Sequence, residues 1–196
     1  MKSLLIFLLI SFTLFMLSSC KKSNNPVGPS ETQQQIWPLK IGNTWGYHVV
    51  IFDSTGKISN YGNTSISIST DTAASNETWY KIYNSSTGVY YTDRSDGLWM
   101  MSNGLQTILY KYPCNVGDVW HFFADSVIVA SKDTIVNTSL NKYTCYLYRI
   151  FYNGKPVVDD YLSPGVGLVA EDYYSSMNSG KVYIKNSLSL ISITLK

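Results

Sequence analysis

The chain has 196 residues, a formal net charge of +2 and only 14% charged residues, but it contains 16 tyrosines and 5 tryptophans. This size corresponds to one domain, alone or with a tail. The basic residues are scattered singly, so no basic stripe is present that would bind phosphates, which argues against a nucleic acid partner. The abundance of aromatic residues favours a sheet over helices.

The N-terminus has the features of a secretory signal peptide. Lys2 precedes an apolar run over residues 4–17, and small residues follow it up to Cys20. This order predicts a signal peptide over residues 1–19. The ending Leu-Ser-Ser-Cys resembles the lipobox of bacterial lipoproteins, which implies cleavage before Cys20 and a diacylglycerol on its sulfur. An uncleaved membrane anchor, or an ordinary signal peptide followed by a chance cysteine, is the alternative.

The predicted location of the protein is therefore the bacterial cell envelope. Acyl chains on Cys20 would hold the protein on a membrane, expected to be the outer membrane, at about 0.8 kcal/mol per buried methylene. The sequence KKSNNPVGPSETQQQ that follows is polar, carries two prolines and has no apolar periodicity. Residues 20–35 are therefore predicted to be the lipidated cysteine and a flexible tether, and residues 36–196 a single β-domain.

From Trp45 onward the apolar residues recur with a period of two. Ile66 and Ile68, for example, alternate with serines in the run NTSISIST. Asp96-Gly97 and Asn153-Gly154 are hairpin signals between strand-like runs. No window after residue 20 combines helical periodicity with capping residues. The pattern predicts an all-β fold, a meandering antiparallel sheet of about twelve strands.

The last predicted strand changes face part of the way along. Its apolar residues occupy even positions up to Leu190 and odd positions from Ile191 to Leu195. Because a strand cannot change faces without an extra residue, this switch predicts a β-bulge near Leu190 and Ile191. A long bent strand suits a strongly curved sheet, so we expect an open or half barrel.

One nonapeptide pattern occurs twice, as WPLKIGNTW over residues 37–45 and as YPCNVGDVW over residues 112–120. We call it the corner motif: an aromatic residue, Pro, two free positions, Ile or Val, Gly, Asn or Asp, one free position and Trp. Proline fixes the backbone, glycine permits a positive φ, and Asn or Asp closes a turn. Each copy is predicted to reverse the chain and begin a strand whose first buried side chain is Trp45 or Trp120. A ligand-binding loop is the alternative.

Four segments occur in an order that resembles a known class of proteins. They are WPLKIGNTWGY, YPCNVGDVW, YTCYLYRI and YLSPGVGLVAED. Together they resemble the TapB-like class of uncharacterised bacterial envelope lipoproteins, a domain of unknown function. The resemblance spans most of residues 36–175. It implies an open, strongly curved antiparallel sheet and brings no catalytic residues.

Lipidation of Cys20 would leave two cysteines, Cys114 and Cys145. In an oxidising compartment they would either form a disulfide or remain separate buried thiols. His48 and His121 are the only histidines. No third metal ligand and no nucleophile motif accompany them, so we predict no metal, no cofactor and no catalytic residues.

Two other groups of residues have part of the composition of a cation site. Residues 93–97 contain Asp, Ser, Asp and Gly but lack the distal acidic ligands of a calcium loop. The acidic pairs Asp159-Asp160 and Glu171-Asp172 would jointly bind a cation only if their strands pair. Solvated sheet edges are the alternative for these pairs.

The strand that begins near residue 143 is aromatic on both faces. Tyr143, Cys145 and Leu147 share one face, whereas the candidate ligand-binding residues share the other: Tyr146, Tyr148 and Tyr152. One face would cover the core and the other would line a groove. The predicted function is a non-enzymatic envelope lipoprotein that binds a hydrophobic ligand or an envelope protein. A carbohydrate-binding module that uses exposed aromatic residues is the alternative, and a hydrolase ranks below both.

Overall fold

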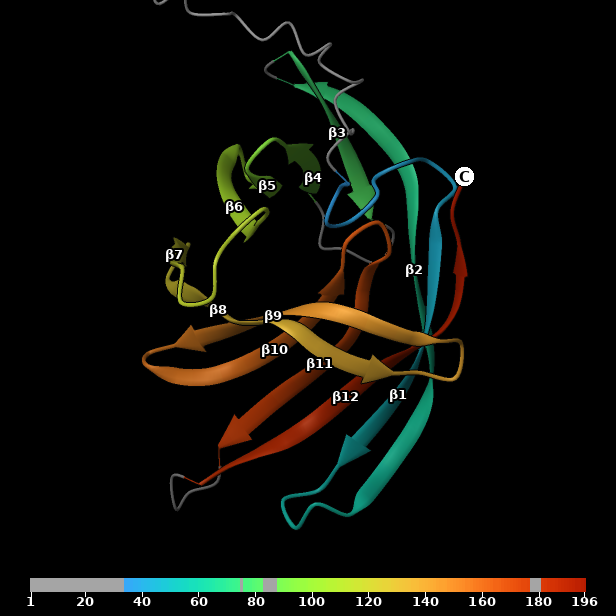
Figure 1. Cartoon of the computed structure of the whole chain (residues 1–196), viewed down its shortest axis with the longest axis vertical. Coiled ribbons are helices and arrows are strands. Elements are labelled where there is room, and N and C mark those ends of the chain that lie inside the picture. Colours follow the sequence, from blue (N-terminus) through green and yellow to red (C-terminus); the bar gives the residue numbers. More distant parts are fainter. Residues whose placement is uncertain (1–33, 75, 83–87, 177–180) are drawn as a thin grey trace, which may run out of the picture. The chain divides into compact units, whose positions relative to one another are not determined.

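The computed structural model describes residues 34–74, 76–82, 88–176 and 181–196 of the chain (Figure 1). The predicted signal peptide, Cys20 and nearly all of the predicted tether lie outside the described residues. Twelve strands account for most of the described chain. They are β1 (Thr44–Phe52), β2 (Ile58–Ala74), β3 (Glu77–Ile82), β4 (Val89–Arg94), β5 (Gly97–Ser102), β6 (Leu105–Lys111), β7 (Val119–Phe122), β8 (Asp125–Asn137), β9 (Lys142–Tyr152), β10 (Lys155–Ser163), β11 (Gly167–Ser176) and β12 (Val182–Thr194).

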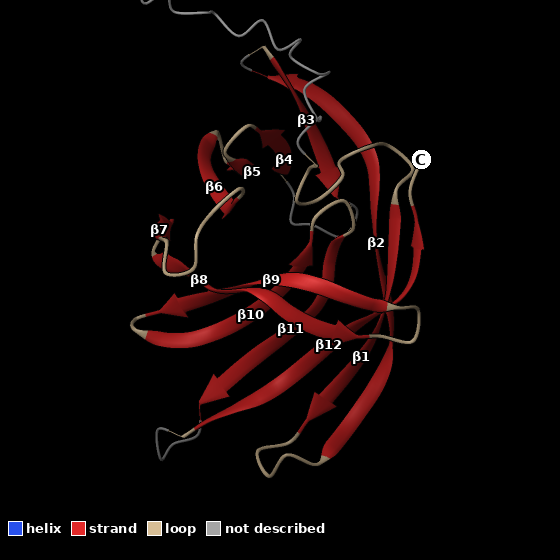
Figure 2. Cartoon of the chain, viewed as in Figure 1, coloured by secondary structure: helices blue, strands red, loops and turns tan. Residues whose placement is uncertain are grey.

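All twelve strands belong to one antiparallel sheet, in the order β6-β5-β4-β3-β2-β1-β12-β11-β10-β9-β8-β7. The first and last strands of the chain pair at the centre, and hairpins continue outward on both sides. The sheet curves until its end strands β6 and β7 approach each other without pairing, so it forms a nearly closed, barrel-like layer. The described residues form no helix (Figure 2). The prediction of an all-β, curved antiparallel sheet of about twelve strands is confirmed.

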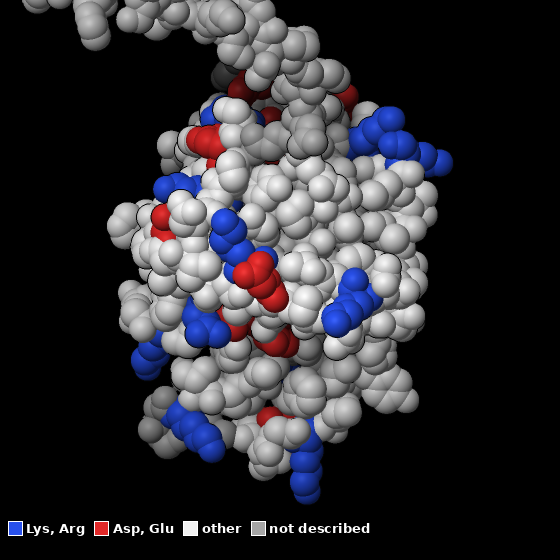
Figure 3. Space-filling model, in the orientation of Figure 1, with Lys and Arg blue, Asp and Glu red and all other residues white. Residues whose placement is uncertain are grey.

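None of the described residues belongs to an apolar helix long enough to span a membrane. On the face of the molecule in Figure 3, lysine and arginine side chains are spread out, with acidic side chains among them.

The predicted β-bulge lies where the parity of the last strand changes. Gly46 of β1 pairs with Ser192 of β12, and the next residue, Tyr47, pairs with Leu190. Ile191 is therefore the extra residue of the bulge. Beyond it Leu190 faces inward and is fully buried.

The two corner motifs form the same glycine turn, although the peptide bond before the proline is cis in the second copy, Tyr112-Pro113, and not in the first. Gly42 and Gly117 have φ values of 89° and 91°. The Gly42 amide donates to the Ile68 carbonyl at 3.0 Å, and the Ile68 amide donates back to the carbonyl of the residue after Gly42 at 2.9 Å. The second copy repeats this exchange with Val129 at 2.9 and 3.0 Å. Trp45 and Trp120 are 0% and 7% exposed. The motif is a structural corner, as predicted.

The concave face of the sheet is filled by side chains of its strands together with Ile36, Trp37 and Leu39, which precede β1. This core is rich in aromatic and branched aliphatic residues from both halves of the sheet. Its fully buried members include Trp45, Tyr47, Leu98, Val127, Val129, Tyr148, Leu162 and Leu190. The middle of the sheet is therefore a packed core, and space for a ligand must be sought at its ends.

Candidate functional site

A segment that precedes the first strand, residues 34–43, packs into one end of the curved sheet. We call it the lead-in segment. Its Gln35 carbonyl accepts a hydrogen bond from the Gly165 amide in the β10–β11 turn at 2.7 Å. At its other end, Asn43 donates to the Pro38 carbonyl and accepts from the Lys196 amide, both at 2.8 Å. The lead-in segment is thus tied both to a distant turn and to the C-terminus.

The β10–β11 turn is shaped to receive this segment. Gly167 has a φ of 93°, and a Cβ atom there would lie 2.6 Å from the ring of Trp37. Trp45 Nε1 donates to the Val166 carbonyl at 2.6 Å, which fixes the turn against β1. The glycines of the run GVGLVA therefore allow close packing in a turn between strands, and no nucleotide-binding helix follows them.

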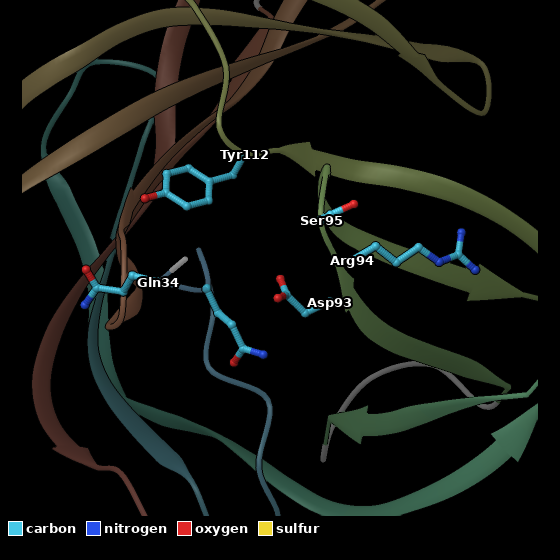
Figure 4. A pocket seen from close by; sticks show the side chains of 6 residues that line it. Gln34, Asp93, Arg94, Ser95 and Tyr112 are labelled. Carbon is cyan, nitrogen blue, oxygen red and sulfur yellow. The ribbon is translucent and has the colours of Figure 1, made fainter. Parts of the chain in front are cut away.

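Two adjoining cavities lie between the lead-in segment and strands β3 and β4. Their volumes are about 260 Å³ and 280 Å³, and both are lined by Gln35 and Asp93. We call the pair the lead-in recess. The first cavity is lined by Gln34, Gln35, Asp93, Arg94, Ser95 and Tyr112 (Figure 4), and the second by Gln35, Leu39, Glu77, Thr78, Tyr80, Thr92 and Asp93. Most of these residues are polar and uncharged.

Asp93 is the central ionisable group of the recess. The pKa of Asp93 is raised to about 6, mainly by partial burial. A hydrogen bond from the Gln35 side chain lowers this pKa, and the charge of Asp96 raises it. Figure 4 shows the Asp93 carboxyl directed into the space toward Gln34 and Tyr112. Asp93 is therefore a carboxylate at neutral pH and becomes protonated in mild acid.

Arg94, which follows Asp93, extends away from the first cavity (Figure 4). Its Nε donates to Glu77 Oε1 at 2.9 Å, and its Nη2 reaches the other carboxylate oxygen of Glu77. Its guanidinium lies 4.3 Å and 5.5 Å from the ring centroids of Trp99 and Trp79. These contacts neutralise Glu77 and engage the guanidinium, so Asp93 dominates the charge of the recess.

The three predicted ligand-binding tyrosines occupy different environments. Tyr148 is fully buried, and its hydroxyl donates to the Lys111 carbonyl at 2.8 Å, so its ring belongs to the core. Tyr146 is half-buried, and its ring centroid lies 5.4 Å from that of Tyr112, which lines the recess. Tyr152 is 52% exposed at the end of β9, next to the turn into β10. Only Tyr146 is close to the recess.

Cys114 and Cys145 are both buried and both free in this structure. Cys114 Sγ lies 3.8 Å from the hydroxyl of Tyr148, on the inner face of β9. Cys145 is three residues before Tyr148 on the same strand, and side chains of a strand alternate between its faces. The strand therefore separates the two thiols.

The two histidines lie apart from the recess residues. His48 is on β1, where its Nδ1 is 3.1 Å from Asn63 Oδ1, and His121 is exposed on β7. Within residues 34–74, 76–82, 88–176 and 181–196, no three His, Cys, Asp or Glu side chains form a group able to hold a metal ion.

The acidic pairs meet the condition of strand pairing but do not lie at a sheet edge. Strands β10 and β11 do pair, with Asp159 opposite Asp172 and Asp160 opposite Glu171. Both strands lie inside the sheet, and Asp159 and Asp160 are buried. The interpretation as a solvated sheet edge is therefore wrong, because neighbouring strands cover both sides of this ladder.

Sequence reasoning missed the residues that form the recess. Gln34 and Gln35 fall within the predicted tether, whose polar composition gives no sign of packing. In the sequence, Asp93 stands out only as part of the incomplete calcium loop at residues 93–97. The available signal was the glycine-rich run at residues 165–167, which indicates that another part of the chain approaches that turn closely.

Comparison with known proteins gives little help in choosing a function. No family model matches the chain, and no curated protein matches it. Among solved structures, a candidate lipoprotein of Parabacteroides distasonis is similar at a TM-score of 0.43 and 11% sequence identity, over 83% of this chain and 99% of that one. The resemblance to the TapB-like class stays a prediction.

Proposed function

We propose that this chain is a lipid-anchored protein of the bacterial envelope that binds a small polyhydroxylated ligand, such as one sugar unit of a glycan, in the lead-in recess. The anchor rests on the sequence up to Cys20. The observation that carries the ligand site is the pair of adjoining cavities, about 260 Å³ and 280 Å³, that share Gln35 and Asp93.

The lining of the recess suits hydroxyl groups better than acyl chains. Asp93 and the amides of Gln34 and Gln35 offer acceptors and donors side by side, and Ser95 adds a hydroxyl. The ring of Tyr112 gives the same cavity an apolar surface, against which the C–H face of a sugar would pack. A ligand held by a few convergent polar groups beside an aromatic ring is typical of small-molecule sites.

A binding role is favoured over hydrolysis by the state of the second carboxylate. Glycoside hydrolysis uses two carboxyl groups on opposite sides of the scissile bond. The recess contains Asp93 and Glu77, but Glu77 is bound to the guanidinium of Arg94 through both carboxylate oxygens. Glu77 is therefore a structural partner of Arg94, and we propose that the recess binds its ligand without transforming it.

Binding of the full-length protein to a glycan array, followed by calorimetry with the sugars that bind, tests this proposal. Asp93→Asn and Gln35→Ala are expected to weaken binding at least tenfold, which corresponds to about 1.4 kcal/mol. Asp133→Asn is a control, because Asp133 is exposed on β8 and does not line the recess. Affinity should also fall as the pH is lowered through about 6, where Asp93 is protonated.

Two results would count against the proposal. One is the absence of any sugar that binds, and the other is equal binding by wild-type protein and by both recess variants. Asp93→Asn should in addition remove the pH dependence of affinity near pH 6, and a variant that keeps it would show that Asp93 does not contact the ligand.

A hydrophobic ligand or a partner protein is the second candidate, and a different surface supports it. A recess of about 270 Å³ is lined by Phe52, Gly56, Tyr183 and Ile184, near the β1–β2 turn. Nearby on β2, Ile58 is 63% exposed. Lipid or detergent that binds there should raise the melting temperature of wild-type protein, because it binds only the folded state, and Ile184→Ser should reduce that rise.

A further inference from the structure

The four acidic residues of β10 and β11 form two cross-strand pairs, Asp159 with Asp172 and Asp160 with Glu171, which lie on opposite faces of the sheet and have different surroundings. Asp159 is bound by Arg149, whose Nε and Nη2 donate to its two oxygens at 2.7 Å and 2.6 Å. The hydroxyl of Tyr174 donates to the same carboxylate at 3.0 Å. Asp160, the next residue, pairs in register with Tyr148 and so faces the core. The charge of Asp159 is thus compensated by a cation.

Asp160 faces the core without such a cation. It is 3% exposed, and its Oδ2 accepts a hydrogen bond from the hydroxyl of Tyr110 at 2.7 Å. Its Oδ1 is buried and has no hydrogen-bond donor among the described residues. The residue directly opposite on β11 is Glu171, a second carboxyl group in side-chain contact with it. Two carboxyl groups, which only accept hydrogen bonds when ionised, therefore lie against each other.

Two ionised carboxyl groups in contact inside a protein repel each other strongly, and burial disfavours the charge of each. One shared proton removes both problems, because a protonated carboxyl donates to an ionised one. We propose that Asp160 and Glu171 form a buried proton-binding site that holds one proton between their carboxyl groups and makes the folded sheet less stable as the pH rises.

Most of the surroundings of the site raise the pKa of Asp160, whereas the hydrogen bond from Tyr110 lowers it. The titratable side chains on this face are Tyr110 from β6, Tyr47 from β1 and Tyr148 from β9, and Tyr91 from β4 acts on Tyr110. Asp159 and Asp172 lie on the same two strands but on the opposite face. None of them is a cation. Burial first, and then the charge of Glu171, raises the pKa of Asp160 well above its usual range, and burial also raises that of Glu171.

The direction of the pH effect follows from the raised pKa values. In the unfolded chain both carboxyl groups ionise near pH 4. The folded chain keeps its proton to a higher pH. Between about pH 4 and the folded pKa, it therefore binds more protons than the unfolded chain does. The stabilisation is complete below about pH 4 and is lost as the pH rises through the folded pKa. Each pH unit in this window lowers the folding equilibrium constant about tenfold.

Asp160→Asn is the variant that tests the site. An asparagine keeps the shape, its amide oxygen can still accept from Tyr110, and its NH₂ group can donate to Glu171 without a titrating proton. Urea unfolding of the full-length protein between pH 4 and pH 9 is the measurement. We expect Asp160→Asn to be more stable than wild type at pH 8, and the difference between the two profiles to correspond to one proton.

Asp159→Asn is a matched control, since Asp159 is an adjacent residue of the same type that is 1% exposed. It should be less stable than wild type at pH 7, because Arg149 loses its partner, and it should keep the wild-type slope at alkaline pH. An infrared band from a protonated carboxyl at pH 7, present in wild type and absent from both Asp160→Asn and Glu171→Gln, would confirm the shared proton directly. A wild-type pH profile in Asp160→Asn, or the absence of that band from wild type, would overturn the proposal.

Discussion

The two corner motifs allow one substitution to be made twice in almost the same setting. Trp45 and Trp120 each lie at the start of a strand, and each has one edge-to-face aromatic partner, Trp37 at 5.7 Å and Tyr148 at 6.0 Å. They differ at the indole nitrogen. Trp45 Nε1 donates to the Val166 carbonyl at 2.6 Å, whereas Trp120 Nε1 is buried without an acceptor among the described residues. Replacement by phenylalanine should therefore have unequal effects.

The expected difference follows mainly from the hydrogen bond, because the contact of the Lys111 ammonium with the Trp120 ring, at 5.4 Å from its centroid, can also be made by a phenylalanine ring. Both Trp→Phe changes shrink a buried ring, and this loss should be similar at the two sites. Trp45→Phe also leaves the Val166 carbonyl without its donor, at a cost of about 1–3 kcal/mol. Trp120→Phe removes an unpaired donor and has no such cost. Trp45→Phe should thus be less stable than Trp120→Phe by about 1–3 kcal/mol.

Thermal and urea unfolding followed by circular dichroism would measure this difference, since fluorescence changes when a tryptophan is removed. For a domain of this size, each 1 kcal/mol lowers the melting temperature by about 2–4 °C. Equal losses in the two variants, or a larger loss in Trp120→Phe, would refute the reasoning from the hydrogen bond.

Two further predictions concern backbone and thiol chemistry. Gly167→Ala should destabilise the fold more than Gly117→Ala does, by about 1–3 kcal/mol in urea unfolding. Both glycines have a positive φ, but only a Cβ at residue 167 would meet a ring, that of Trp37. Equal losses of stability would contradict this. Cys114 and Cys145 should react slowly with a maleimide in folded protein and quickly in urea, since burial raises the pKa of both thiols, that of Cys145 to about 12. Failure to label in urea without reductant would instead show a disulfide.

The features that the sequence predicts well are those encoded locally. The face switch at Leu190 and Ile191 is visible in the parity of the apolar residues, and the bulge lies there. The corner motif carries its own proline, glycine and turn-closing residue, so its turn can be predicted locally, although hydrogen bonds with Ile68 or Val129 hold it to another strand. Short-range patterns of this kind were sufficient to predict the fold class and the approximate number of strands.

The lead-in recess depends on contacts between residues that are far apart in the sequence. Gln35 is held by the amide of Gly165, and Asp93 reaches it from β4. A polar run before the first strand gives no periodicity, so its composition cannot distinguish a tether from a packed segment. The prediction that the tyrosines bind a ligand is limited for a related reason. Strand parity places Tyr146 and Tyr148 on one face, but it does not show that this face covers the filled core.

The acidic residues of β10 and β11 are visible in the sequence, but their surroundings are not. Two adjacent pairs of acidic residues are visible in the sequence, but their chemistry depends on the register of β10 against both of its neighbours. That register places Asp159 beside Arg149 and Asp160 beside Tyr148, so one carboxyl gains a cation and the next gains a phenol ring and a second carboxyl. A shift by one residue would exchange these surroundings. The pH dependence of stability therefore tests the register of the sheet as well as the shared proton.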